Sequence, residues 1–236
     1  GVSTTLTFSS AENHALDIVG AGKASCILDG GRATQILSIS TTQTDADVTV
    51  RGLTLQNGSC GMNGGALNVS VQGAAVTLSD CRIADNETTG QQSVGGGAAC
   101  SSETGTVTVA SCTFSRNTSG GNVGGLYVAT FSGTGRIIDC AFQDNAVDNA
   151  AGSEYFGDGG GAMLYSGGTS TGDISGNTFI GNSASGGSNP DGGGLMTYQL
   201  GAGSALTLDD NLFDGNTAGL DGGGCILRFN STGNEV

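Results

Sequence analysis

A repeat of about 30 residues constrains this chain more than any other feature of its sequence. Six segments carry a short apolar stretch and then Cys, Asn or an apolar residue, and five of them continue as x-[Phe or apolar]-x-x-Asn. The last glycines of the runs that follow these segments stand at positions 65, 97, 125, 161, 194 and 224. A spacing that varies around a fixed pattern suits strands of constant length joined by loops of variable length.

The repeat predicts an all-β fold built from stacked coils. Alternating apolar stretches of three to five residues are too short to bury a face alone. Stacked on copies of themselves about 4.8 Å apart, they pair in parallel and enclose a shared core. Helical repeats of this length need windows of ten or more helix-forming residues, which the chain lacks. We therefore expect a single-stranded β-solenoid, a parallel β-helix with short strands and turns rich in Gly and Asn.

Two motifs of the repeat resemble those of a known family. Gly64-Gly65-Ala66-Leu67 matches a GGA[ILV] motif, and an FxxN motif recurs at Phe114/Asn117, Phe142/Asn145, Phe179/Asn182 and Phe213/Asn216. Paired motifs of this kind resemble the repeats of chlamydial polymorphic outer-membrane proteins and of related bacterial surface proteins. The resemblance covers most of the chain from about Cys26 onward and implies a right-handed parallel β-helix. It says less about function, because a fold does not fix a function.

We expect one β-helix domain over residues 1–236. Residues 1–47 lack the motif and are expected to form irregular N-terminal coils, whereas residues 48–236 form about six coils of the repeat. Neither end carries an obvious amphipathic cap, and an uncapped solenoid leaves strand edges that template further pairing. We therefore expect the domain to continue in a longer chain or to stack end to end.

Equivalent residues of successive coils should form ladders along the axis. The Phe column is expected to be an internal apolar stack, and it comprises Leu55, Ile83, Phe114, Phe142, Phe179 and Phe213. The Asn column could supply active-site amides, but we expect a turn ladder whose side chains bond to neighbouring backbone and tolerate a left-handed φ. It comprises Asn86, Asn117, Asn145, Asn182 and Asn216.

A third column holds cysteines. It begins with Cys81, Cys112 and Cys140 and continues with Asn177 and Asn211. Metal binding is one interpretation, but the chain has no CxxC motif and a single His, so we expect buried thiols packed in a stack. A disulfide between Cys60 and Cys100 is a further hypothesis that the sequence leaves open.

Aspartates stand directly before three successive glycine runs, at Asp158, Asp191 and Asp221. Stacked at coil spacing, three carboxylates would repel one another unless they were neutralised. Either each carboxylate accepts hydrogen bonds from its own glycine N–H groups, or adjacent coils hold Ca²⁺ between them. We expect the first arrangement, so that no cofactor is required, and keep calcium as the alternative.

The strand after each glycine run predicts a contact surface. If its first and third residues point inward, its second and fourth residues face solvent. That face would expose Leu67, Tyr127, Met163, Tyr165, Met196, Tyr198 and Ile226. An exposed patch of this kind usually marks a partner or assembly site. Complete burial of Met163 and Met196 within one chain would argue against it.

Charge narrows the function classes. The chain has 21 acidic and 7 basic residues, a formal charge of −14, which argues against nucleic acid as a partner. No apolar run approaches the 18 residues that a spanning helix needs, so we expect no membrane insertion by this segment. We expect an extracellular or cell-surface location, and as partners a second copy of the chain, a host or surface protein, or a glycan.

Three function classes remain in competition. We expect a non-catalytic scaffold or adhesin-like element, with self-assembly through its ends or its Tyr/Met face as a further hypothesis. The main alternative is a polysaccharide lyase or hydrolase, which needs carboxylates with a nearby base or paired across the scissile bond. The seven Lys and Arg residues fall in different positions of the repeat, which disfavours a lyase. Ice binding is the third class, but Arg136 and Asp173 interrupt the column of threonines on which it would depend.

Overall fold

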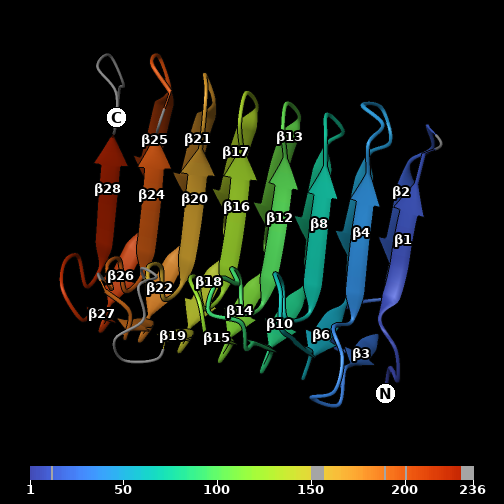
Figure 1. Cartoon of the computed structure of the whole chain (residues 1–236), viewed down its shortest axis with the longest axis horizontal. Helices are drawn as coiled ribbons and strands as arrows, with labels where there is room; N and C mark the ends of the chain where they lie inside the picture. Colours follow the sequence, from blue (N-terminus) through green and yellow to red (C-terminus); the bar gives the residue numbers. More distant parts are fainter. Residues whose placement is uncertain (12, 150–156, 189, 200, 230–236) are drawn as a thin grey trace.

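The computed structural model describes residues 1–11, 13–149, 157–188, 190–199 and 201–229. Within these ranges the chain forms 28 strands and no helix, and the strands pair in parallel into four sheets, named A to D here. Figure 1 shows the strands of sheet A side by side in a row, with β1 at one end and β28 at the other. Each full coil contributes one strand to each sheet, which confirms the expected β-solenoid.

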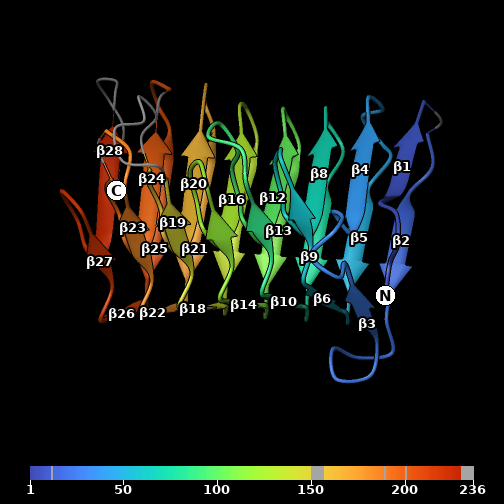
Figure 2. The same cartoon turned by 60° about the horizontal axis from the view of Figure 1, so that its bottom comes forward.

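The first two sheets contain the longest strands. Sheet A consists of β1 (Leu6–Ser10), β4 (Leu37–Thr41), β8 (Leu67–Val71), β12 (Ala98–Ser102), β16 (Leu126–Thr130), β20 (Ala162–Ser166), β24 (Leu195–Gln199) and β28 (Cys225–Phe229). Sheet B consists of β2 (Leu16–Val19), β5 (Val48–Arg51), β9 (Val76–Ser79), β13 (Thr106–Ala110), β17 (Thr134–Ile138), β21 (Thr171–Ser175) and β25 (Ala205–Asp209). Turned by 60°, the same molecule shows β5, β9 and β13 of sheet B below β4, β8 and β12 of sheet A (Figure 2).

The other two sheets are made of two- and three-residue strands. Sheet C consists of β3 (Ile27–Asp29), β6 (Thr54–Gln56), β10 (Arg82–Ala84), β14 (Thr113–Ser115), β18 (Ala141–Gln143), β22 (Thr178–Ile180) and β26 (Leu212–Asp214). Sheet D consists of β7 (Ser59–Cys60), β11 (Glu87–Thr88), β15 (Thr118–Ser119), β19 (Ala146–Asp148), β23 (Ser183–Ser185) and β27 (Thr217–Ala218).

Alternation along the strands fills the core. In β8 the side chains of Leu67, Val69 and Val71 are buried, whereas Asn68 and Ser70 between them face outward. The same positions of neighbouring strands are paired in register, so each inward residue lies directly over its counterpart. The buried side chains of the coils therefore form one continuous hydrophobic core along the axis.

The Phe column is confirmed as an internal stack. Register pairs join its members from Leu55 in β6 to Phe213 in β26. The rings of Phe114, Phe142, Phe179 and Phe213 follow one another at centroid distances of 5.1, 4.7 and 4.8 Å and are tilted by only 5–7°. Offset stacking at these distances adds about 0.5–1.5 kcal/mol per pair beyond the burial of apolar area.

The Asn column forms a hydrogen-bonded ladder inside the turn between sheets C and D. Each Nδ2 donates to the Oδ1 of the next Asn at 2.9 Å, from Asn86 to Asn216. The same Oδ1 accepts from the backbone N–H of the preceding Asn, and each Nδ2 also reaches a carbonyl one coil back, as from Asn145 to Phe114 at 3.0 Å. The prediction of amides bonded to neighbouring backbone is therefore correct.

The left-handed φ that we expected at the asparagines occurs instead at the residue before each of them, so this part of the prediction is wrong. Positive φ angles of 52–63° occur at the residues that precede the ladder, such as Arg116, Asp144 and Gly181, and not at the asparagines. The left-handed residue bends the chain, and the Asn after it then points into the coil. The first, looser copy shows the same offset, since Asn57 itself has a φ of 54° and Gly58 N–H donates to Asn86 Oδ1 at 2.7 Å.

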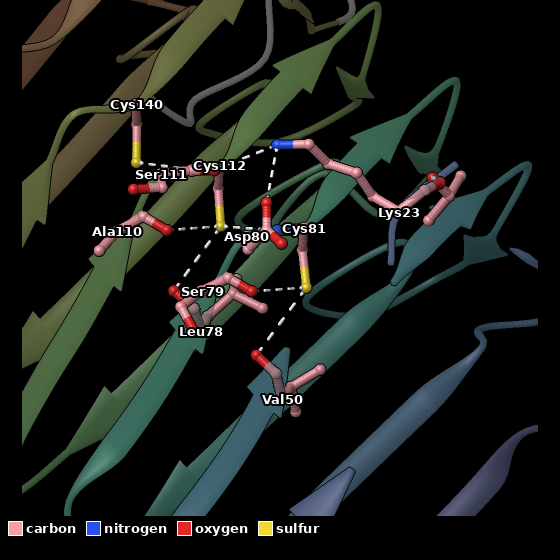
Figure 3. Close-up of polar contacts among 11 residues, drawn as sticks. Lys23, Val50, Leu78, Ser79, Asp80, Cys81, Ala110, Ser111, Cys112 and Cys140 are labelled. Atoms are coloured by element: carbon pink, nitrogen blue, oxygen red, sulfur yellow. Dashed lines mark hydrogen bonds and ion pairs between the residues drawn. The ribbon is translucent and has the colours of Figure 1, made fainter. Parts of the chain in front are cut away.

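The cysteine column is the counterpart of the Asn ladder at the turn between sheets B and C (Figure 3). Cys112 Sγ accepts from the backbone N–H of Cys81 at 3.4 Å, and Cys140 Sγ accepts from that of Cys112 at 3.5 Å. Asn177 Oδ1 takes the same role toward Cys140 at 2.9 Å, and Asn211 toward Asn177 at 3.1 Å. A thiol and an amide oxygen thus fill the same position as inward acceptors, which confirms the buried thiol stack.

These thiols form no disulfide bonds. Hydrogen bonds with the thiols of Cys140 and Cys81, together with burial, raise the pKa of Cys112 well above its ordinary value. The hydrogen bonds with Cys112 in turn lower the pKa of Cys81 and of Cys140. Among the described residues, the three thiols do not gather into a group that could hold a metal ion. All seven cysteines lie in the described part of the chain and are free, so the hypothesis of a Cys60–Cys100 disulfide is wrong.

Residues 1–47 share the sheets of the later coils. The strands β1, β2 and β3 pair in register with β4, β5 and β6, and β4 pairs with β8. In the described residues, sheet D has no strand before β7, so the first coils differ from the rest mainly on that side. The last residues of the expected domain, 230–236, lie outside the described part. None of the described segments is a helix that could cross a membrane.

Replacing Asn145 by Ala should test the Asn ladder. The substitution leaves the N–H of Asn117 and the carbonyl of Phe114 buried without a partner, and we expect it to lower the free energy of unfolding by about 3 kcal/mol. The control is Thr118→Ala at an exposed position of β15, which should stay within about 0.5 kcal/mol of the unmodified protein. Urea denaturation measures both, and equal stability of the two variants would contradict the ladder's role.

Candidate functional site

The outer face of sheet A changes character along the axis. Its second-position column runs Ser38, Asn68, Ala99, Tyr127, Met163, Met196 and Ile226. Its fourth-position column runs Ser40, Ser70, Ser101, Ala129, Tyr165, Tyr198 and Arg228. Small polar residues therefore cover the strands near the N-terminus, and aromatic and long side chains cover β16 to β28.

Leu67 does not belong to this face. The register pairs it with Ala98 and pairs Asn68 with Ala99, so Leu67 points inward and is fully buried. The predicted face was aligned on the last glycine of each run, which is Gly65 in this coil and Gly97 in the next. In the structure Ala66, and not Gly65, lies opposite Gly97, so the alignment is one residue out of register at this coil.

The methionines of the predicted contact surface are buried. Met163 and Met196 are 5% and 0% exposed, so this part of the prediction is wrong. They pack with Val123 into a second hydrophobic cluster outside the coil, against which Tyr127, Tyr198 and Ile226 also pack. Val123 belongs to the turn that precedes β16, so the glycine-run turns extend over part of this face.

The tyrosines that remain half-buried line a pocket of about 430 Å³, called the tyrosine pocket here. Its lining comprises Val94, Asn122, Tyr127, Asp158, Met163, Tyr165, Tyr198 and Arg228. The strands β16, β20 and β24 each supply one tyrosine, and the rings of Tyr165 and Tyr198 lie 6.3 Å apart. Val94, Asn122 and Asp158 come from the turns that precede β12, β16 and β20.

The aspartate column stacks as predicted, but its hydrogen bonds run between coils. Asp158 Oδ1 accepts from the backbone N–H of Asp191 at 3.2 Å, and Asp191 Oδ1 accepts from that of Asp221 at 2.9 Å. The expected partners, the glycine N–H groups of the same coil, instead bond to carbonyls of the next coil. Each carboxylate therefore fixes the turn that follows it along the axis.

The second oxygens of two carboxylates bind side chains that line the tyrosine pocket. Tyr198 donates its hydroxyl to Asp158 Oδ2 at 3.1 Å, and Arg228 Nη2 donates to Asp191 Oδ2. Arg228 also contacts Tyr198, with Nη1 3.4 Å from the hydroxyl and the guanidinium carbon 5.6 Å from the ring centroid. One arginine and one tyrosine thus compensate two buried carboxylates.

This arrangement does not form a calcium site. Across the described ranges, no three His, Cys, Asp or Glu side chains lie close enough together to hold a metal ion. Asp191 is neutralised by Arg228, and Asp221 is exposed. The repulsion that motivated the calcium hypothesis is therefore relieved by hydrogen bonds and by a cation that the chain itself supplies.

Asp158 is the carboxyl group of the pocket, and its pKa lies near neutral pH. Burial raises its pKa to about 6, against the hydrogen bonds from the Asp191 N–H and the Tyr198 hydroxyl, which lower it. Burial likewise raises the pKa of Tyr127 and of Tyr198 to about 12, so both phenols are neutral donors. A carboxyl group that changes charge near pH 6 beside neutral phenols is suited to hydrogen bonding and to proton transfer.

Two residues of this region were missed by sequence reasoning. Val123 has a φ of 64°, at the position that Gly95 and Gly159 fill in the neighbouring coils with φ values of 70° and 75°. A β-branched residue in this conformation is strained. Asn122, the residue before it, holds a buried Oδ1 that accepts no hydrogen bond among the described residues. The shortened run Gly124-Gly125, with Val in place of the first glycine, was the signal available in the sequence.

The strain at Val123 predicts that Gly is more stable than Ala at this position, the reverse of the usual order. At most positions Gly is about 0.5–1 kcal/mol worse than Ala, but here Gly also removes a left-handed penalty of about 1–2 kcal/mol. We expect Val123→Gly to unfold at a higher urea concentration than Val123→Ala. The matched pair is Val128→Gly and Val128→Ala in β16, also fully buried, where Ala should be the more stable. The same order at both positions would contradict the strain.

Asp158 predicts a pH-dependent stability. Its folded pKa of about 6 lies above the ordinary 3.8, so its contribution is fully present below about pH 4 and is lost as the pH rises through 6. At about 1.4 kcal/mol per pH unit, the shift from 3.8 to about 6 makes this loss about 3 kcal/mol. Asp158→Asn should therefore gain stability relative to the unmodified protein between pH 4 and pH 7. Exposed Asp209→Asn should not, and a pH-independent difference for Asp158→Asn would refute the assignment.

Comparison with known proteins agrees with this architecture. No curated protein and no solved structure matches the chain. The family model described as the right-handed β-helix region matches residues 18–236, which span the strands from β2 to β28. The chain therefore belongs to the right-handed β-helix family.

Proposed function

We propose that this chain is a non-catalytic, adhesin-like β-solenoid of the cell surface or extracellular space, which binds a glycan in the tyrosine pocket. The observation that carries the proposal is the convergence of Tyr127, Tyr165 and Tyr198 from successive coils beside Asp158 and Arg228. Binding pockets for small molecules combine aromatic walls with a few placed polar groups, and sugars present both apolar faces and hydroxyls.

The polar groups of the pocket favour a ligand rich in hydroxyls. Asn122 lines the pocket, and its buried Oδ1 lacks a donor among the described residues. Asp158 Oδ2 accepts from the Tyr198 hydroxyl, and Tyr165, which is half-buried, offers its ring and hydroxyl.

The charges of the chain favour a neutral glycan over an acidic one. The cation of Arg228 is already bound to Asp191, and the chain carries a formal charge of −14. Both facts disfavour an acidic polysaccharide.

The proposed location at the cell surface is supported by the repeats and not by the pocket. The GGA[ILV] and FxxN repeats resemble those of bacterial surface proteins, and a hydrogen-bonded solenoid makes a stiff carrier for a binding site. Assembly through a Tyr/Met face has lost its basis because the methionines are buried. End-to-end stacking stays a prediction.

A polysaccharide hydrolase is the second candidate, favoured by the raised pKa of Asp158 near 6. A retaining or inverting hydrolase needs a second carboxylate across the scissile bond, and Asp191 is bound to Arg228 instead. Release of reducing ends from any glycan, lost in Asp158→Asn, would establish this candidate and overturn the non-catalytic proposal.

Binding is tested with a panel of immobilised neutral and acidic glycans, followed by titration calorimetry. We expect neutral glycans to bind without turnover, and Tyr165→Ala to weaken binding at least tenfold because it removes an aromatic wall. The control is Thr108→Ala on the outer face of sheet B, which should bind as the unmodified protein does. Absence of neutral-glycan binding, or unchanged binding by Tyr165→Ala, would contradict the proposal.

A further inference from the structure

A second hollow lies on the outer side of sheet A, toward the N-terminus. It has a volume of about 470 Å³ and is called the serine groove here. Its lining includes Ser40, Ser70, Ser101, Gln72, Glu103 and Phe131. The three serines pair in register across β4, β8 and β12, so their side chains form a row of hydroxyls at coil spacing.

The serine groove and the tyrosine pocket share one column of sheet A. Register pairs continue from Ser101 through Ala129 to Tyr165 and Tyr198. From Ser40 to Tyr198 the column crosses five coil steps of about 4.8 Å, or roughly 24 Å. The small side chain of Ala129 stands between the row of hydroxyls and the tyrosines and is itself buried, so a ligand that crosses here would pass over the side chains that cover Ala129.

Phe131 links the two hollows. It lines the serine groove, is 47% exposed, and places its ring 5.7 Å from the ring of Tyr165, which lines the tyrosine pocket. Its backbone is fixed, since the N–H groups of Phe131 and Ser132 both donate to the carbonyl of Glu103, at 3.1 and 2.8 Å. An exposed aromatic ring on a fixed backbone is a ready-made contact for a ligand that crosses from one hollow to the other.

We propose that the serine groove and the tyrosine pocket form one elongated site for a neutral oligosaccharide, which lies along the solenoid axis and contacts Phe131 at the junction. This inference rests on the proposed glycan-binding function and extends it to a ligand of several sugar units. The serine hydroxyls and the Gln72 amide donate and accept hydrogen bonds toward sugar hydroxyls, and the Glu103 carboxylate accepts them.

The chemistry of the groove disfavours other occupants. None of the described residues that line it is basic, so it offers no partner for an acidic sugar or a phosphate. An extended peptide gains affinity by adding to an open sheet edge. The backbone groups of β4, β8 and β12 already pair within sheet A, so a peptide would find side chains alone.

The test is titration calorimetry with neutral gluco- and manno-oligosaccharides of one to six units. The elongated site predicts that affinity rises at least tenfold from the shortest ligand bound to the longest. Phe131→Ala should remove this gain. Ser101→Glu, which places a bulky charge in the groove away from the tyrosine pocket, should also remove the gain while the shortest ligand still binds, whereas Thr108→Glu on sheet B should leave the gain intact.

The outcomes separate the two proposals. Binding of a short neutral sugar that is lost in Tyr165→Ala, with no gain for longer chains, would overturn the elongated site and leave the proposed function standing. A gain that survives both Phe131→Ala and Ser101→Glu would also overturn it. Failure of every neutral sugar to bind would remove the proposed function and this inference together. Circular dichroism of each variant confirms that the β fold is retained.

Discussion

The ladder of amides from Asn86 to Asn216 is the interaction on which the rest of the structure depends. Each amide satisfies the backbone N–H of one coil and a carbonyl of another, so a turn closes only when its neighbours are in register. A net hydrogen bond contributes about 1 kcal/mol, but a buried group left without its partner costs about 1–3 kcal/mol. The ladder therefore penalises a slipped register more strongly than it rewards the correct one. The thiol and amide column from Cys81 to Asn211 applies the same constraint at a second turn.

Fixed register turns every position of the repeat into a column, and the candidate site follows from two of them. The aspartate column and the fourth-position column of sheet A stand seven residues apart in each coil, as in Asp191 and Tyr198. Because the columns run parallel, Asp158 meets the tyrosine of the next coil and Asp191 meets the arginine of the next. A repetitive scaffold thus produces a local site wherever the residues of adjacent columns change from small to aromatic.

The sequence predicted what repeats and missed what departs from the repeat. The Phe, Asn and Cys columns recur with the same spacing inside each segment, so their stacking could be foreseen. Leu67 was misplaced because a coil with Ala66 in a glycine position looks one residue shorter than it is. The burial of Met163 and Met196 was missed because they pack against Val123, whose left-handed φ shows in the sequence only as a Val in the place of a glycine. The serine groove was missed because serines are common throughout the chain and only register makes a row of them.

Native-state hydrogen exchange followed by NMR tests most directly whether the ladder holds the coils in register. The backbone amides of Asn86, Asn117 and Asn145 donate into buried side-chain oxygens, so they open only when neighbouring coils separate. The account predicts that these amides exchange with the free energy of global unfolding, as do the buried strand amides of β12 and β16. Exchange of the ladder amides through local openings, at free energies well below those of the strands, would contradict it.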